Sequence, residues 1–140
     1  MVVDNRLVIS LAVAVGLILG PLLSAYAGDV EQIKPDDLKS MIEKKQPGFV
    51  VVDVQPKGAY ELGHIKGAIN FPWDSDIKNP GRLPKDKTLI LYCDCGHEED
   101  STDTAQQLMT KFGYKDVKIL EGGWSGWQKL GYPTEKGKKK

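Results

Sequence analysis

Two short apolar runs constrain the fold of this chain more than any other feature. The segments Phe49–Val54 and Thr88–Tyr92 show little polar alternation and are rich in β-branched or large apolar residues. Strands that are buried on both faces of a parallel sheet have this composition, whereas strands with one face in solvent alternate apolar and polar residues. Such strands need covering layers on either side, so the two runs predict an α/β fold.

Segments with helical periodicity alternate with these runs. Apolar residues three and four positions apart mark one face of each predicted helix, so Trp124 and Trp127 are expected in the core. Strands that alternate with helices favour a mostly parallel sheet with helices on both faces. The predicted helices cover Pro35–Lys45, Lys57–Leu62, a segment capped by Asp100 or Ser101 that carries Ala105, Leu108, Met109 and Phe112, and a segment from Trp124 to Gly131, and further short strands are predicted at Ala68–Phe71 and Val117–Leu120.

The first 27 residues form a separate unit. Arg6 precedes an apolar stretch over residues 7–24, and residues 25–27 provide an A-x-A site for signal peptidase. This order predicts a secretory signal peptide that is cleaved after Ala27, and hence a periplasmic protein. The alternative is an uncleaved membrane anchor that leaves the domain facing the periplasm, because the apolar stretch is close to the minimum length for spanning a bilayer.

Residues 28–135 suit one compact domain, and the Lys-rich tail of residues 136–140 is expected to be solvated. The chain has 19 Lys and Arg residues and 19 Asp and Glu residues, and residues 1–27 hold one charge of each sign, on Asp4 and Arg6. The remainder is therefore also formally neutral, which argues against nucleic acid as a partner. A membrane partner is expected only if the N-terminal segment stays uncleaved.

The only two cysteines, Cys93 and Cys95, stand between a predicted strand and a predicted helix. In open α/β sheets, ligands bind beyond the carboxyl ends of strands, and the free N–H groups of a following helix favour an anion. A helix N-terminus also lowers the pKa of a cysteine thiol, which makes the sulfur nucleophilic near neutral pH. The alternative is that both cysteines pack as small apolar residues or form a structural disulfide, and the pair alone does not decide between these interpretations.

Four stretches together resemble the single-domain rhodanese family, in the family's order and spacing. The resemblance extends from about Ile33 to Pro133 and implies a rhodanese-like α/β fold with a central sheet of about five strands. The stretches are Val52 to Val54, Tyr60 to Asn70, Leu91 to Cys93, and Leu120 to Pro133. Structural roles are expected for the motif residues other than the cysteine, namely Asp53, Gly63, His64, Gly67, Gly122, Gly123 and Trp124.

The resemblance implies sulfur transfer, with Cys93 at the position of the family's active-site cysteine. That cysteine attacks the outer sulfur of thiosulfate, a polysulfide or a protein persulfide donor and holds it as a persulfide, which a thiol or another thiophilic acceptor then removes. N–H groups that converge on the sulfur would stabilise its negative charge. No cofactor and no metal are expected. The active-site loop that would supply the N–H groups comprises Asp94, Cys95, Gly96, His97, Glu98, Glu99, Asp100 and Ser101.

The loop departs from the family's usual pattern in length and in charge. Ser101 lies eight positions after Cys93, further than in the common loop, and Gln55 replaces an Arg that often follows the first Asp-Val motif. The loss of that Arg is expected to loosen a structural ion pair. Clustered carboxylates repel thiosulfate, so Arg82 and Lys85 are candidate substrate cations. The acidic residues that replace the family's loop cation are Glu98, Glu99, Asp100 and Asp103.

Cys95 leaves several functions open. It can act as a resolving thiol that forms a short-loop disulfide with Cys93, which would make the protein a thiol-redox or sulfur-relay module. Cys93, Cys95 and His97 with a carboxylate can instead hold a soft metal, although cysteine pairs of structural zinc sites are usually separated by about two to four residues. A catalytically silent rhodanese-fold interaction domain would need neither thiol. Sulfur transfer through Cys93 is the function that the motifs favour.

Overall fold

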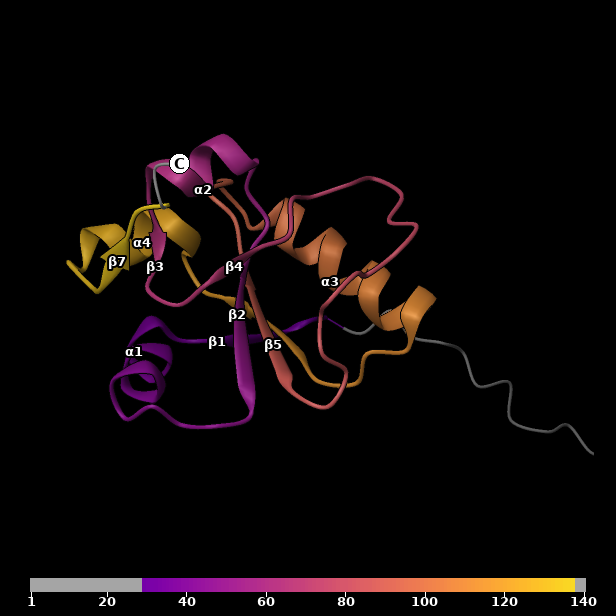
Figure 1. The fold of residues 1–140 in the computed structure, drawn as a ribbon, viewed down its shortest axis with the longest axis horizontal. Coiled ribbons are helices and arrows are strands. Elements are labelled where there is room, and N and C mark those ends of the chain that lie inside the picture. Colours follow the sequence, from indigo (N-terminus) through magenta and orange to yellow (C-terminus); the bar gives the residue numbers. More distant parts are fainter. Residues whose placement is uncertain (1–28, 138–140) are drawn as a thin grey trace, which may run out of the picture.

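A computed structural model describes residues 29–137 of the chain (Figure 1). The predicted signal peptide and the last three residues of the Lys-rich tail lie outside the described residues. Within the described part every helix is too short or too polar to cross a membrane. The elements are β1 (Glu31–Ile33), α1 (Pro35–Glu43), β2 (Phe49–Asp53), α2 (Lys57–Leu62), β3 (His64–Ile65), β4 (Ile69–Asn70), β5 (Thr88–Tyr92), α3 (Glu99–Phe112), β6 (Val117–Leu120), α4 (Gly123–Lys129) and β7 (Thr134–Glu135).

Five strands form one parallel sheet in the order β1-β6-β5-β2-β4. The central pair is β2 and β5, in which Phe49 lies beside Thr88 and Asp53 lies beside Tyr92. The carboxyl ends of these two strands therefore meet at the same edge of the sheet. The predicted α/β architecture, with a mostly parallel sheet of about five strands, is confirmed.

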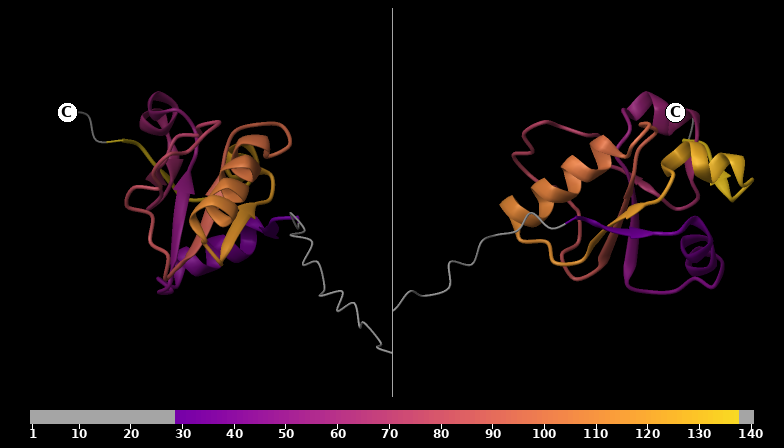
Figure 2. Two further views of the ribbon diagram at one scale, coloured as in Figure 1. Left: turned by 90° about the vertical axis from the view of Figure 1, so that its right-hand side faces the viewer. Right: turned by 180° about the vertical axis from the view of Figure 1, so that it is seen from behind.

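Side chains of the central strands alternate between two apolar layers, as the pleat of a strand requires. Val52, Leu89 and Leu91 pack on one face with Ala105 and Leu108 of α3. On the other face, Val51, Ile90 and Tyr92 pack with Leu38 of α1 and with Trp124 and Trp127 of α4. Figures 1 and 2 show α3 on one side of the sheet and α1 and α4 on the other. The predicted helices on both faces, and the core positions of the two tryptophans, are confirmed.

Three short strands were not predicted from the sequence. Strand β1 is mostly exposed, and β3 and β7 form a separate antiparallel pair in which His64 lies beside Glu135. Segments of two or three residues carry too little periodicity to be recognised, because the partner strand and not the local sequence defines them.

The start of α3 differs from the expectation. Asp100 or Ser101 was expected to cap the helix, but the cap position is Glu98, which has a left-handed backbone with φ 54°, and both predicted residues lie inside the first turn. The Ser101 hydroxyl donates to the carbonyl of Glu98 at 2.9 Å. The prediction was wrong because Ser101 lies inside the first turn. Its hydroxyl donates a hydrogen bond to the backbone carbonyl before the helix, whereas a capping hydroxyl accepts one from a free N–H group.

Candidate active site

Tyr92, the last residue of strand β5, and Cys93, which follows it, have side chains that point to opposite faces of the sheet. Tyr92 joins the apolar layer that contains α4, and Cys93 joins the layer that contains α3. Both side chains are buried, Tyr92 fully and Cys93 to within 2% of full burial. The two faces at this point hold two different sets of polar groups.

The first set surrounds the buried carboxylate of Asp53. The hydroxyl of Tyr92 donates to Asp53 Oδ2 at 2.7 Å and accepts the N–H of Ile65 at 3.0 Å. The backbone N–H of Gln55 donates to Asp53 Oδ1 at 2.8 Å. Burial raises the pKa of Asp53, and these hydrogen bonds oppose the rise because they favour the charged form. The network joins the ends of β2 and β5 to β3.

Gln55 occupies the position at which the common rhodanese pattern has an Arg. Its side-chain amide donates to Asp53 Oδ2 at 3.3 Å. Gln55 therefore gives the Asp53 carboxylate a hydrogen bond from a neutral amide, whereas an Arg at this position would form an ion pair with it. The amide of Asn70 further donates to the carbonyls of Asp53 and Gln55, at 3.0 and 2.8 Å.

The backbone of Cys93 is held by the start of α4. The N–H of Trp124 donates to the Cys93 carbonyl oxygen at 2.8 Å. A Cβ at position 123 would lie 2.4 Å from that same oxygen, and Gly123 has φ +52°, so glycine is required there both for space and for conformation. This contact gives a physical reason for the Gly-Gly-Trp motif, because it fixes the position of the cysteine.

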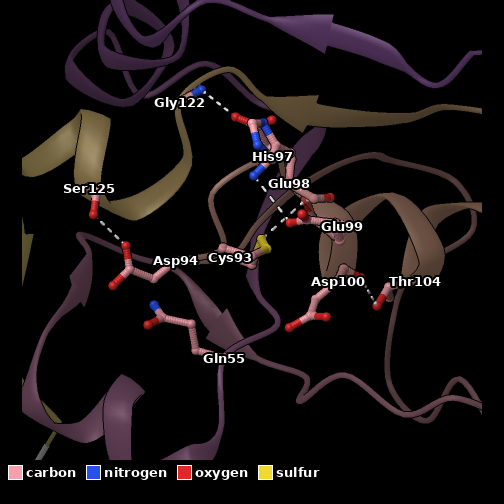
Figure 3. Close-up of a disulfide and its surroundings, with 12 residues drawn as sticks. Gln55, Cys93, Asp94, His97, Glu98, Glu99, Asp100, Thr104, Gly122 and Ser125 are labelled. Atoms are coloured by element: carbon pink, nitrogen blue, oxygen red, sulfur yellow. Dashed lines mark hydrogen bonds between the residues drawn. A yellow bond between two sulfur atoms is a disulfide. The ribbon is translucent and has the colours of Figure 1, made fainter.

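The sulfur of Cys93 is bonded to the sulfur of Cys95, with the two Cα atoms 5.5 Å apart. The hydroxyl of Ser101 lies 3.7 Å from Cys93 Sγ. Cys95 is only partly buried, in contrast to Cys93. The disulfide joins the end of the strand directly to the loop, and the structure therefore represents the oxidised form of the pair (Figure 3).

Three carboxylates of the loop already accept hydrogen bonds from nearby donors (Figure 3). Glu98 Oε1 accepts the N–H of Gly122 at 2.9 Å, and Asp94 Oδ1 accepts the hydroxyl of Ser125 at 2.5 Å. Glu99 Oε2 accepts the N–H of His97 at 3.1 Å. The N–H groups of Glu99 itself and of His97 lower the pKa of Glu99, which keeps this exposed side chain ionised. Part of the expected anion site is thus occupied by the protein's own carboxylate.

Other N–H groups of the loop remain available. Those of Asp94, Cys95 and Gly96 donate to no acceptor within residues 29–137. They follow Cys93 directly and precede the N-terminus of α3, where backbone dipoles also favour negative charge. Cys93, these free N–H groups and Ser101 thus lie in one loop, and the Ser101 hydroxyl is the group of the loop that lies next to the Cys93 sulfur besides Cys95.

A family model described as Rhodanese-like domain matches residues 34–130. This chain belongs to the rhodanese-like domain family. It is 26% identical over 117 residues to the thiosulfate:glutathione sulfurtransferase of Saccharomyces cerevisiae, in an alignment covering 74% of this chain and 82% of that protein. It is 29% identical over 105 residues to the adenylyltransferase and sulfurtransferase UBA4 of Candida albicans, covering 71% of this chain and 24% of that one.

The fold also matches solved structures of the family. The BH2092 protein of Bacillus halodurans superposes with a TM-score of 0.68 at 32% identity, covering 76% of this chain and 77% of that one. Several curated relatives are much longer than this domain: the matched part of the chain spans only 19% to 42% of their lengths. The family and the fold are therefore shared with proteins of varied size.

His64 lies away from Cys93, in the second sheet of this rhodanese-like domain. It is buried, and its ring stacks on Tyr60 with 3.8 Å between ring centroids. Nδ1 is 2.8 Å from the Tyr60 carbonyl oxygen and Nε2 is 3.3 Å from Glu135 Oε1. Glu135 also accepts the N–H of Gly67 at 2.9 Å. This hydrogen bond, and to a smaller extent the one with His64, lowers the pKa of the Glu135 carboxyl. These contacts fasten β7 to β3.

The structure does not bring the two candidate substrate cations to the rhodanese loop. Lys85 Nζ donates to the carbonyl of Phe112 at 2.6 Å, at the carboxyl end of α3, whereas the cysteine loop precedes its amino end. A helix of 14 residues is about 20 Å long. Arg82 is exposed and precedes Leu83, whose carbonyl accepts the Tyr114 hydroxyl near the same end.

A cavity of about 230 Å³ lies next to the loop on the side of Asp94. Its lining includes Gln55, Gly63 and Trp124 as well as Asp94, and it contains one carboxylate but no cationic side chain. The sulfur of Cys93 is not part of this lining, since it faces α3. Within the described residues, moreover, no three His, Cys, Asp or Glu side chains are grouped as a metal site would require.

Sequence reasoning missed two polar partners of the rhodanese motifs. Tyr92 was read only as an apolar strand residue, although its hydroxyl is central to the Asp53 network. Ser125, which holds Asp94, was not considered. A buried tyrosine usually needs a partner for its hydroxyl, and this was the available signal for Tyr92. The sequence contains no comparable signal for Ser125.

Proposed function

We propose that this protein is a sulfurtransferase that carries sulfane sulfur as a persulfide on Cys93. The observation that carries the proposal is the place of Cys93, at the carboxyl end of the central strand β5 with its carbonyl fixed by Trp124. The N–H groups of Asp94, Cys95 and Gly96 follow immediately and face no acceptor within the described part of the chain. Family membership and the sulfurtransferases among the relatives support the same chemistry.

The reaction starts from the reduced cysteine pair. The Cys93 thiolate attacks the outer sulfur of the donor, a new S–S bond forms on Cys93, and the donor leaves as a thiolate or as sulfite. Backbone N–H groups at the amino end of α3 stabilise the negative charge on the thiolate and then on the persulfide. A thiophilic acceptor removes the outer sulfur by a second attack of the same kind.

The donor class that fits the loop is a persulfide, on a small thiol or on a protein, more than thiosulfate. Thiosulfate carries two negative charges, whereas the loop that follows Cys93 carries the carboxylates of Asp94, Glu98 and Glu99. The cavity beside Asp94 contains no cation to offset them. Negative charges in the same loop raise the free energy of a bound dianion more than that of a monoanionic persulfide or a persulfide on a neutral protein surface.

The proposal includes export, which rests on residues 1–27 alone. Their basic start, apolar stretch and A-x-A site are typical of a secretory signal peptide. Mass analysis of the protein recovered from a periplasmic fraction tests this, since cleavage after Ala27 predicts a chain that begins at Gly28. Retention of the full-length chain in the membrane fraction would instead indicate an anchor.

The decisive test is intact mass spectrometry of the reduced protein after exposure to thiosulfate and, separately, to polysulfide. For the Cys95→Ser variant, in which a persulfide on Cys93 cannot be resolved internally, we expect a gain of one sulfur atom that cyanide removes. The matched Cys93→Ser variant should gain none. If Cys95→Ser gains no sulfur from either donor, the sulfurtransferase proposal fails, and a thiol-redox module based on the disulfide takes its place.

A further inference from the structure

The structure suggests a fate for the transferred sulfur that does not need an external acceptor. We infer that Cys95 resolves the Cys93 persulfide within the same loop and releases hydrogen sulfide, so that the protein reduces the sulfane sulfur of persulfides. This inference rests on the proposed function, because it begins with the persulfide on Cys93. It adds a second activity, a persulfide reductase, and a second substrate class, a thiol or dithiol reductant.

The geometry that carries the inference is the direct bond between the two cysteines. Cys93 Sγ and Cys95 Sγ are joined while the rest of the site is intact, with the Cys93 carbonyl on Trp124 and Ser101 closed onto Glu98. Cys95 can therefore reach the sulfur of Cys93 without displacement of the strand or of α3. Groups held together in this way react with effective concentrations of about 10⁵ M or more in favourable cases.

Cys93 is buried in the disulfide form, whereas Cys95 is only partly buried. Cys93 is 2% exposed, and its sulfur lies on the α3 side of the sheet, next to Ser101. Cys95 belongs to the loop that follows Cys93 and is itself partly exposed. Once a persulfide has formed on Cys93, Cys95 is therefore a thiol of the same loop that competes with any external acceptor.

Two sulfur-transfer steps convert the reduced cysteine pair and a persulfide into the disulfide and sulfide. The Cys93 thiolate takes the outer sulfur from a donor R–S–SH, forming Cys93–S–SH and releasing R–S⁻. The Cys95 thiolate then attacks Cys93 Sγ, the bond between Cys93 Sγ and the outer sulfur breaks, and HS⁻ leaves with the electron pair. The cysteine pair loses two electrons and becomes the disulfide seen in the structure, while the sulfane sulfur gains two and becomes sulfide. A small thiol or a dithiol protein returns the disulfide to the reduced pair.

A single-turnover experiment with glutathione persulfide tests the inference. Reduced wild-type protein, freed of excess reductant, is mixed with the persulfide, and both the sulfide released and the intact mass are followed. We expect one sulfide per chain above the Cys93→Ser blank, together with loss of two hydrogens from the protein. Cys95→Ser and Cys95→Ala should keep the added sulfur and release sulfide at least about tenfold more slowly.

The outcomes separate the two proposals. If the Cys95 variants gain sulfur but the wild type also keeps it, without forming the disulfide, the reductase inference fails and the sulfurtransferase proposal stands. Equal rates of sulfide release from the wild type and the Cys95 variants would likewise overturn the reductase inference and leave the sulfurtransferase proposal standing. If no variant gains sulfur, both proposals fail. Thermal unfolding of each variant beside the reduced wild type shows whether a missing signal reflects lost folding.

Discussion

Tyr92 and Cys93 are adjacent in the chain, yet the polar groups around Tyr92 are hydrogen-bonded whereas several of those next to Cys93 are not. On the face of Tyr92, the hydroxyl, the Asp53 carboxylate and the Ile65 N–H are all paired, and no buried side-chain nitrogen or oxygen within residues 29–137 lacks a partner. On the face of Cys93, N–H groups stay free and carboxylates crowd the loop. Complete pairing holds the strand in place on the first face, whereas the free N–H groups of the second face are the ones that the proposed sulfur transfer would use.

Gly123→Ala is expected to disturb the surroundings of Cys93 most severely. The added Cβ would lie 2.4 Å from the Cys93 carbonyl oxygen, and the residue must also keep φ +52°. We expect a loss of about 3 kcal/mol or more in the free energy of unfolding. The persulfide yield per folded molecule should also fall, because the cysteine must move.

The neighbouring glycine supplies the matched control. Gly122 also has a positive φ, +74°, but a Cβ there would meet only Gly126 Cα at an ordinary 3.6 Å. Gly122→Ala should therefore cost roughly 1–2 kcal/mol, from backbone strain alone, and leave the persulfide yield unchanged. Urea unfolding and intact mass measure both effects. Equal costs for the two variants would show that the contact with Cys93 is not the cause.

Tyr92→Phe is expected to disrupt the hydrogen bonds on the opposite face of the sheet. This variant removes one donor from the buried Asp53 carboxylate and leaves the Ile65 N–H without its acceptor. We expect a loss of about 2–4 kcal/mol in urea unfolding. Persulfide formation per folded molecule should stay near the wild-type level, since Cys93 faces the other layer.

Tyr114→Phe is the matched control for that loss. The Tyr114 hydroxyl is also buried, but it makes one hydrogen bond, to the neutral carbonyl of Leu83 at 2.7 Å. Its removal should cost about 1 kcal/mol. A Tyr92→Phe variant no less stable than Tyr114→Phe would contradict the structural role given to the Asp53 network.

Glu99→Gln removes one negative charge from the loop that follows Cys93. The Glu99 carboxylate accepts the N–H of His97 beside the cysteine, where it opposes a dianionic donor. We expect kcat/KM for thiosulfate to rise about fivefold at most, with a smaller gain for a persulfide donor. Glu43→Gln on α1, paired with Lys39 at 3.0 Å, makes the same charge change far from the loop and should alter neither value.

The smallest expected effect is a pH dependence that distinguishes Asp53 from ordinary surface carboxylates. Burial raises its pKa in the folded state, so between the unfolded and the folded pKa the native protein holds a proton that the unfolded chain has lost. This group therefore lowers stability as pH rises through that window, which starts near an unfolded pKa of about 4.

Asp53→Asn removes that titration. The free energy of unfolding of the variant, relative to wild type, should improve from pH 4 upward and then level off. Urea unfolding at several pH values between 4 and 8 measures the difference. A relative stability that declines with rising pH would mean that the hydrogen bonds from Tyr92 and Gln55 outweigh burial.

Much of the fold was predictable because it depends on local periodicity. The bounds of α2 and β5 match the predicted segments, and β2 ends one residue earlier than predicted. The same periodicity predicted a helix up to Lys45, but α1 ends at Glu43, and Lys45 has a positive φ of 50°. Elements that exist only through pairing, such as β3 with β7, gave no signal of their own.

The site was predictable only in part, for a related reason. The place of Cys93 after an apolar strand follows from the sequence, and so does the loop between that strand and a helix. The contacts that define the site join residues distant in the chain: Tyr92 and Asp53 are 39 positions apart, and Asp94 and Ser125 are 31 apart. Charge alone suggested Arg82 and Lys85, but the path of their loop leads to the far end of α3.

The opposite orientations of Tyr92 and Cys93 constrain how such a protein can change during evolution. An inserted or deleted residue before Cys93 within β5 would exchange the two side chains between the faces, putting a phenol in the loop and a thiol beside Asp53. A change of length after Cys93 alters only the loop. We therefore expect related sequences to differ in the number of residues between this cysteine and the next helix, while the spacing on its amino side stays constant.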